Sequence, residues 1–258
     1  VFKGQVINLD VDLEPVIPIE PENIPLDIIH KDNDFYIINK PSGLVIHPGA
    51  GNHSGTLQNG LLYLDPNQGI LPRAGIVHRL DKDTSGLIVV ARKSASYLSL
   101  INQIKDRRVT KIYSGICNNI PISGGTIDHP ISRNPRDRLK MTVNNNGKPA
   151  KTFYKVIEKF RAHCLLEIKI ETGRTHQIRV HLSYENYPLL GDPIYGGRPI
   201  LPSSPSNELK DSISKFKRQA LHASYLSFIH PSSGKGISFT SSLPKDMSDI
   251  LIILARDK

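Results

Sequence analysis

Short runs of alternating apolar and polar residues recur along the chain, and this spacing predicts strands in excess of helices. The segment from Asp34 to Pro41 predicts a short apolar strand that a proline stops. Residues 75–91 place a polar, charged loop between two β-branched apolar segments, which predicts a strand, a turn and a second strand. Further strands are predicted at 109–117, 153–160, 164–171 and 225–230, the last with a hairpin partner at 236–240.

Helical spacing occurs at three places. Ser94 is the expected N-cap of a helix that runs to about Arg107, and Thr175 is the expected N-cap of a second helix. A third begins at 243–246, and residues 202–214, rich in Ser and Pro, predict a surface loop. The residues expected to face the core are Leu98, Ile101 and Ile104 in the first helix, Ile178 and Leu182 in the second, and Met247, Ile250, Leu251 and Leu254 in the third. Hairpins mixed with helices predict an α+β fold.

The N-terminal region differs from the rest in composition. Residues 1–12 are followed by an acidic, Pro-rich passage, so 1–20 are expected to hold the end of a preceding unit and a linker. Residues 21–258 are expected to form one catalytic domain, which is long enough to bury a core. The first residue is Val rather than Met, so the chain is expected to be a fragment of a longer protein.

The charge balance predicts a polyanionic partner. The chain has 33 Lys and Arg against 24 Asp and Glu, a formal net charge of +9 and a pI near 9.5, and phosphate contacts supply most non-specific affinity for nucleic acid. Residues 131–140 carry four cations with few apolar neighbours, and we expect them to face an RNA backbone.

The remaining composition argues against several protein classes. Cys117 and Cys164 have no metal-like spacing, and both are expected to be small buried residues of a reduced, cytoplasmic protein. No apolar run approaches the roughly 20 residues of a membrane span, and no signal peptide opens the chain.

Candidate chemistry lies first in the loop His78-Arg79-Leu80-Asp81-Lys82-Asp83. Cationic neighbours favour the ionised form of a carboxylate, so an Asp here is expected to be a charged nucleophile or an ion-pair partner at neutral pH. Charge alone does not rank Asp81 against Asp83. A surface turn with a solvated charge cluster is the alternative interpretation.

The second candidate stretch is 172–182. Arg179 is expected in the first turns of a helix, whose N-terminus itself attracts anions. His176 and His181 suggest a metal site, but residues five apart do not share a helical face and no carboxylate lies at ligand spacing. No metal is therefore expected, and these polar side chains are expected to orient a substrate.

The segment from His78 to Leu87 resembles the signature of the large-subunit ribosomal branch of the pseudouridine synthases, and this resemblance selects Asp81 as the catalytic residue. It implies the pseudouridine synthase fold, a curved, mixed, mostly antiparallel central sheet flanked by helices and loops. In that family an RNA-binding module of the ribosomal protein S4 type commonly comes first, so residues 1–20 are expected to include its remnant. Further segments resemble the family in the same order: 39–41, 47–52, 172–182, 191–199 and 219–223.

The implied reaction isomerises uridine to pseudouridine, which requires neither cofactor nor metal. By resemblance, Asp81 is the catalytic carboxylate, Arg179 orients it through a charge-assisted pair, and Tyr113 stacks on the base. Because the target nucleotide must leave its stack, flanking side chains are expected to hold the RNA. The residues expected to contact RNA are His78, Arg79, Lys111, Arg133, Arg136, Arg174 and His176.

Three segments, 51–52, 130–133 and 216–223, resemble most closely the branch that modifies the intersubunit-bridge hairpin, helix 69, of 23S rRNA. The expected partner is therefore 23S rRNA or a large-subunit particle, bound by a monomer. A synthase acting on another rRNA site or on tRNA is the alternative within the enzyme class. Outside it, the alternatives are a non-catalytic RNA-binding protein of ribosome assembly and a metal-dependent hydrolase.

Overall fold

A computed structural model describes residues 2, 4–6, 19–49 and 51–257, so most of the expected N-terminal remnant lies outside the described residues. The described part contains one nine-stranded sheet in the order β1-β2-β3-β10-β4-β9-β8-β5, with β11 also paired to β10. The strands of this sheet are β1 (Ile28–Lys31), β2 (Phe35–Lys40), β3 (Ser85–Ala91), β4 (Thr110–Asn118), β5 (Gly125–Asp128), β8 (Lys151–Lys159), β9 (His163–Ile170), β10 (Leu221–Ile229) and β11 (Gly236–Thr240).

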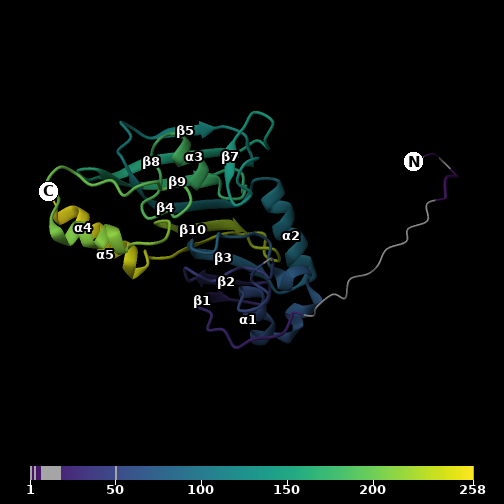
Figure 1. Ribbon diagram of the computed structural model, residues 1–258. Helices are drawn as coiled ribbons and strands as arrows, with labels where there is room; N and C mark the ends of the chain where they lie inside the picture. Colours follow the sequence, from purple (N-terminus) through teal and green to yellow (C-terminus); the bar gives the residue numbers. More distant parts are fainter. Residues whose placement is uncertain (1, 3, 7–18, 50, 258) are drawn as a thin grey trace.

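Helices cover this sheet, and a separate hairpin lies beside it (Figure 1). The helical elements are α1 (Leu57–Leu64), η1 (Pro66–Ile70), η2 (Pro72–Gly75), α2 (Ser94–Lys105), α3 (Gln177–Tyr184), α4 (Asn207–Lys215) and α5 (Lys245–Arg256), and the hairpin is β6 (Ile131–Arg133) with β7 (Met141–Val143). Strands β3 and β10 run parallel, whereas the other strand pairs of the sheet are antiparallel. The predicted α+β class with a mixed, mostly antiparallel sheet is confirmed.

Strand β2 is buried on both faces because its side chains alternate between two apolar clusters. Phe35 and Ile37 pack in the cluster that contains Leu100 of α2, whereas Tyr36 and Ile38 pack in the cluster that contains Leu57 of α1. The other half of the sheet packs against α3 through a third cluster, and α4 and α5 lie together at one end of the molecule (Figure 1).

One glycine allows β3 and β10 to pair at the centre of the sheet. Gly86 has φ +112°, and a Cβ at this position would lie 2.3 Å from the carbonyl oxygen of Ala223 on β10. A larger residue would therefore separate the parallel strands β3 and β10. This close approach fixes the start of β3, and with it the loop 78–84 that precedes it.

The prediction of a strand at the beginning of 75–91 is wrong, because Ile76 forms only an isolated bridge to Val90. Strand β3 pairs with β2 from Gly86 to Ala91 but with β10 only at Ser85 and Gly86. The Val89 N–H donates to the His78 side chain rather than to a backbone carbonyl of a neighbouring strand. The segment from Val77 to Thr84 therefore stays irregular and leaves its side chains free to line a cleft.

Helix α2 covers the predicted residues but buries a different face. Lys93, not Ser94, is the N-cap residue, and Leu98 is 61% exposed. The buried positions are Ser96, Leu100 and Gln103, because Ser96 donates to Asp34 and Gln103 forms two hydrogen bonds with the backbone of Ile229. Tertiary hydrogen bonds thus rotate the helix so that Ile101 and Ile104 are only half-buried.

Two further local predictions need correction. Helix α3 is not capped by Thr175; His176 stands at the N-cap in a left-handed conformation, and the Gln177 side chain instead accepts from the Arg174 N–H and the Thr172 hydroxyl. The predicted loop 202–214 contains most of α4, whose Leu209 and Ile213 are buried among residues of α5. The buried faces of Ile178, Leu182, Met247, Ile250 and Leu254 are confirmed.

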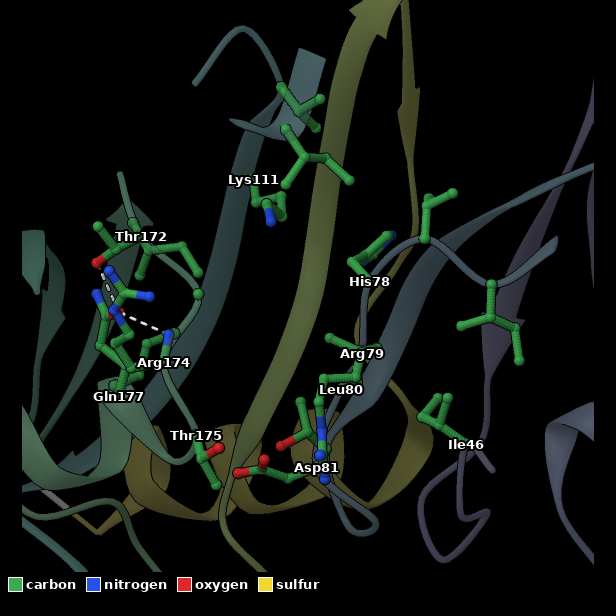
Figure 2. Close-up of a pocket in the computed structure, with 18 of the residues that line it drawn as sticks. Ile46, His78, Arg79, Leu80, Asp81, Lys111, Thr172, Arg174, Thr175 and Gln177 are labelled. Atoms are coloured by element: carbon green, nitrogen blue, oxygen red, sulfur yellow. Dashed lines mark hydrogen bonds between the residues drawn. The ribbon is translucent and has the colours of Figure 1, made fainter. Parts of the chain in front are cut away.

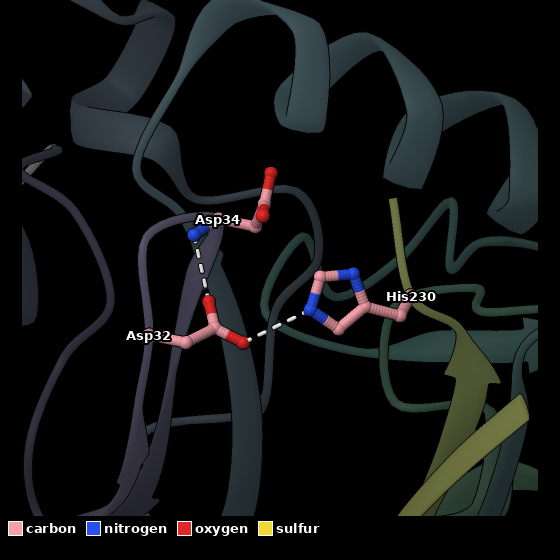
Figure 3. Close-up of side chains that lie close together, drawn as sticks. All are labelled: Asp32, Asp34 and His230. Atoms are coloured by element: carbon pink, nitrogen blue, oxygen red, sulfur yellow. Dashed lines mark hydrogen bonds and ion pairs between the residues drawn. The ribbon is translucent and has the colours of Figure 1, made fainter. Parts of the chain in front are cut away.

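A hydrogen-bonded cluster joins the β1–β2 turn to the end of β10 (Figure 3). The Asp32 carboxylate accepts from the N–H groups of Asp34 and Phe35, and its other oxygen lies 3.2 Å from the Nε2 atoms of both His30 and His230. Asp34 in turn accepts from the hydroxyls of Ser96 and Ser232. These hydrogen bonds explain why the carboxylates and the imidazole lie together, and they connect the β1–β2 turn to the end of β10.

The two cysteines are fully buried, as predicted, and lie opposite each other on β4 and β9. Each helix in the described part of the chain is too short or too polar to span a lipid bilayer.

Candidate active site

A cleft of about 720 Å³ opens beside the centre of the sheet. In Figure 2, His78, Arg79 and Asp81 of the loop before β3 lie on one side, Thr172, Arg174 and Gln177 lie on the other, and Lys111 lies between them. Eight of the ten residues predicted from the sequence line this cleft: Asp81, Tyr113, Arg179, His78, Arg79, Lys111, Arg174 and His176. The other two, Arg133 and Arg136, do not line it; they are exposed on the β6–β7 hairpin.

Asp81 and Arg179 meet although 98 positions separate them. The Nη1 atom of Arg179 donates to Asp81 Oδ2 over 3.1 Å. The Arg179 side chain is only 4% exposed, whereas the Asp81 side chain is 17% exposed and lines the cleft. A buried cation thus holds a carboxylate whose free side faces the space where a ligand would lie.

Arg179 also forms an ion pair with Asp192, a residue for which no role was predicted from the sequence. The Nε and Nη2 atoms of Arg179 donate to the two oxygens of Asp192 over 2.7 and 2.8 Å. Asp192 also accepts from the N–H groups of Ile194 and Tyr195, and the Tyr195 ring lies 5.0 Å from the guanidinium carbon. Burial disfavours the charged guanidinium, but the Asp192 and Asp81 carboxylates outweigh it and raise the pKa of Arg179 above its usual value.

Tyr113 and Lys111 are two residues apart on β4 and therefore lie on one face of the strand. Burial, together with the nearby charge of Asp81, raises the pKa of Tyr113, so its phenol stays protonated at neutral pH. Burial also lowers the pKa of Lys111. Both side chains line the cleft on the sheet side.

His78 anchors the loop to the sheet. Its Nε2 atom accepts from the backbone N–H of Val89 on β3 over 3.1 Å. Burial, with a smaller contribution from Lys111, lowers the pKa of His78 to about 3, so the ring is neutral. The next residue, Arg79, is exposed at the wall of the cleft.

Lys40, which is fully buried, connects the same loop to the segment after β2 through hydrogen bonds. Its ammonium donates to the carbonyl oxygens of Pro41, Leu44 and Lys82 over 2.8, 2.9 and 2.8 Å, which uses all three of its hydrogens. Burial lowers the pKa of Lys40 to about 7, against the attraction of Asp83 and Asp81.

The supporting roles of Lys40, Asp192 and Tyr195 were not predicted from the sequence. Their segments, Asn39-Lys40-Pro41 and 191–199, resemble the family, but no local pattern indicates which groups they contact. His181, the other histidine of a rejected metal pair, is buried and hydrogen-bonded to the Thr152 hydroxyl and the His129 carbonyl.

The cleft carries a strong excess of positive charge. Its cationic residues are Arg73, Arg79, Lys105, Arg107, Lys111, Arg174 and Arg179, against two carboxylates, Asp81 and Glu171. Seven cations against two anions favour a polyanionic ligand, since phosphate groups supply the complementary charge.

Residues 34–184, more than half of the chain, match the family described as RNA pseudouridylate synthase. The chain belongs to this family. As a pseudouridine synthase it is 47% identical over 254 residues to the ribosomal large subunit pseudouridine synthase D of Xanthomonas campestris, covering 98% of this chain and 77% of that protein. It is 45% identical over 257 residues to the protein of the same name from Escherichia coli, covering 100% of this chain and 79% of that protein.

Solved structures agree with the family. The human RNA pseudouridylate synthase domain containing 4 aligns with a TM-score of 0.68 at 27% identity and covers 88% of this chain and 92% of that chain. The human RNA pseudouridylate synthase domain containing 1 aligns with a TM-score of 0.65 at 29% identity, with coverages of 84% and 83%. This chain is therefore an isomerase that acts on RNA.

Proposed function

We propose that Asp81, Arg179 and Tyr113 together isomerise uridine to pseudouridine in the cleft. The observation that carries this proposal is the contact of 3.1 Å between the Asp81 carboxylate and the buried guanidinium of Arg179. A carboxylate fixed on one side by a cation keeps its other side free for the ribose, and it is already in position before the reaction begins.

The three side chains divide the work. Asp81 acts on the ribose of a nucleotide that has left its stack, so that the bond between N1 and C1′ breaks and the base rejoins through C5. The C5 hydrogen is then lost as a proton and N1 gains a proton, so the overall reaction is an isomerisation. Tyr113 presents a protonated phenol and an aromatic face on which the detached base stacks. Arg79, exposed at the wall, supports the vacated space in the RNA, and Lys111 and Arg174 contact phosphate or base.

The substrate we propose is 23S rRNA at helix 69, bound as free rRNA or in a large-subunit particle. The relatives named ribosomal large subunit pseudouridine synthase D support this choice. The β6–β7 hairpin carries Arg133 and Arg136 outside the cleft, which suits contact with the backbone of an RNA stem. All three catalytic side chains belong to one chain, so we propose a monomer, working in the cytoplasm where a ribosomal substrate is found.

Asp81→Asn tests the catalytic assignment. This change removes the charge but keeps the shape, so we expect pseudouridine formation to be lost while RNA affinity changes little. Asp83→Asn is the matched control, because it alters the other carboxylate of the same loop. Pseudouridine is mapped by chemical labelling and primer extension on a 23S rRNA transcript. Substantial product from Asp81→Asn, or equal loss from both variants, would contradict the assignment.

The substrate assignment has its own test. We expect the wild-type protein to modify the helix 69 hairpin in preference to tRNA transcripts and to other rRNA fragments. Product that appears first in tRNA would reject the rRNA target while leaving the catalytic residues in place.

A further inference from the structure

We propose that His176 is a further catalytic residue, whose Nε2–H donates a hydrogen bond to a carbonyl oxygen of the departing uracil. This inference rests on the proposed function and adds a group that stabilises the leaving base. It assigns His176 a position on the reacting base rather than on the RNA backbone.

The tautomer assigned to His176 follows from the hydrogen bonds of Tyr195 when its phenol hydrogen points to the ring. The backbone N–H of Met141 donates to the Tyr195 hydroxyl oxygen over 2.8 Å, and that oxygen lies 2.9 Å from His176 Nδ1. An N–H can only donate, so the phenol oxygen accepts from Met141, and among the described residues His176 Nδ1 is the remaining partner for the phenol hydrogen. We assign the phenol hydrogen to this contact, which makes Nδ1 the acceptor and places the hydrogen of a neutral ring on Nε2.

The Nε2 atom lies near the reacting carboxylate but does not form a hydrogen bond with it. It lies 3.9 Å from Asp81 Oδ2, which is beyond hydrogen-bond distance, and the His176 side chain is 18% exposed in the cleft. Within the described part of the chain, Nε2 forms no hydrogen bond. The donor is thus left for a ligand atom that sits beside Asp81.

His176 has an unfavourable backbone conformation. His176 has φ 55° and ψ 20°, a left-handed conformation that is uncommon for residues other than glycine. Such conformations persist only where surrounding contacts impose them, and they cluster at functional sites. Here the contacts are the Tyr195 hydroxyl at Nδ1 and the first turn of α3.

A donor at this point would favour the bond-breaking step. When the bond between N1 and C1′ breaks, its electron pair stays with uracil, and the resulting monoanion spreads its charge over N1, O2 and O4. A preoriented N–H stabilises this charge more than it stabilises neutral uridine, which lowers the barrier. Burial lowers the pKa of His176, Arg179 and Arg79 act in the same direction, and Asp81 opposes them, so the ring donates as a neutral imidazole at pH 7.

The test compares two variants with two substrates. His176→Phe removes the donor, and Tyr195→Phe removes the hydroxyl that sets the tautomer. We expect kcat to fall about 10²-fold for His176→Phe and less for Tyr195→Phe, with RNA Kd unchanged, as for loss of one oxyanion donor. His129→Gln is the matched histidine control, because its side chain lies outside the cleft and the hydrogen bond to His181 uses only its backbone.

The second substrate carries 5-fluorouridine at the target position, and the single-turnover rate of its consumption is measured because fluorine blocks the last step. Fluorine stabilises the departing anion, so the loss caused by His176→Phe is expected to be smaller with 5-fluorouridine than with uridine. Equal losses with both bases, or weaker RNA binding at unchanged kcat, would overturn the proposal, and if His176→Phe does not fold, an unchanged kcat of folded Tyr195→Phe would do so. A wild-type protein that forms no pseudouridine would instead reject the proposed function itself.

Discussion

Replacing Asp192 by alanine is expected to destabilise the protein strongly, because Asp192 neutralises a buried cation. Asp192→Ala removes both hydrogen-bonded acceptors from the Nε and Nη2 atoms of Arg179, whose side chain is 4% exposed, and also leaves the N–H groups of Ile194 and Tyr195 without their acceptor. Water cannot easily replace these acceptors, since the Asp192 side chain itself is 0% exposed.

Breaking a buried ion pair by removing one partner costs about 3–5 kcal/mol of the free energy of unfolding. For a chain of this length, each kcal/mol lowers the melting temperature by about 2–4 °C, so a decrease of about 6–20 °C is expected. Pseudouridine formation is expected to fall too, because Arg179 would lose the contact that holds it toward Asp81.

Arg218 and Asp246 provide a matched control. Their pair has the same two-point geometry, with distances of 2.6 and 2.8 Å, but the Asp246 side chain is 47% exposed. Asp246→Ala is therefore expected to cost no more than about 1 kcal/mol. Urea unfolding of both variants, followed by far-UV circular dichroism, measures the difference. Equal losses, or a loss below about 1 kcal/mol for Asp192→Ala, would refute the reasoning from burial.

Three further predictions concern the loop, the hairpin and the β1–β2 turn. Lys40→Met leaves three buried carbonyls without a donor, so it is expected to lower the free energy of unfolding by about 2–5 kcal/mol. Urea denaturation measures this loss, and an unchanged midpoint would show that water replaces the ammonium. Arg133→Ala is expected to weaken RNA binding and to reduce the slope of log K against log salt by about 0.7–0.9, and an unchanged slope would remove the hairpin from the RNA surface. For Asp32, burial acts to raise the pKa, but hydrogen bonds from Asp34, Phe35 and His30 outweigh it and lower the pKa below 3.8. The resulting stability is therefore present above pH 3.8 and is lost as pH falls through the folded-state pKa, and Asp32→Asn is expected to flatten this part of the acid unfolding curve.

The sequence by itself determined most strands of the central sheet, the family and most residues of the cleft. Alternation of apolar residues follows from the local geometry of a strand, so it identifies β2, β4 and the β8–β9 pair without knowledge of the fold. The motifs around Asp81 and Arg179 carry the resemblance because their residue types and order are properties of the chain itself. Eight of the ten predicted site residues therefore line one cleft.

Only the tertiary structure decided which groups support that cleft. The partners of Arg179, Lys40 and His176 are Asp192, three loop carbonyls and Tyr195, and the spacing of these residues in the sequence does not indicate such contacts. The buried face of α2 was likewise set by hydrogen bonds to Asp34 and Ile229 rather than by its apolar spacing. Periodicity reports where a side chain prefers to lie relative to water, whereas a hydrogen bond or ion pair also depends on where distant segments of the chain are brought together.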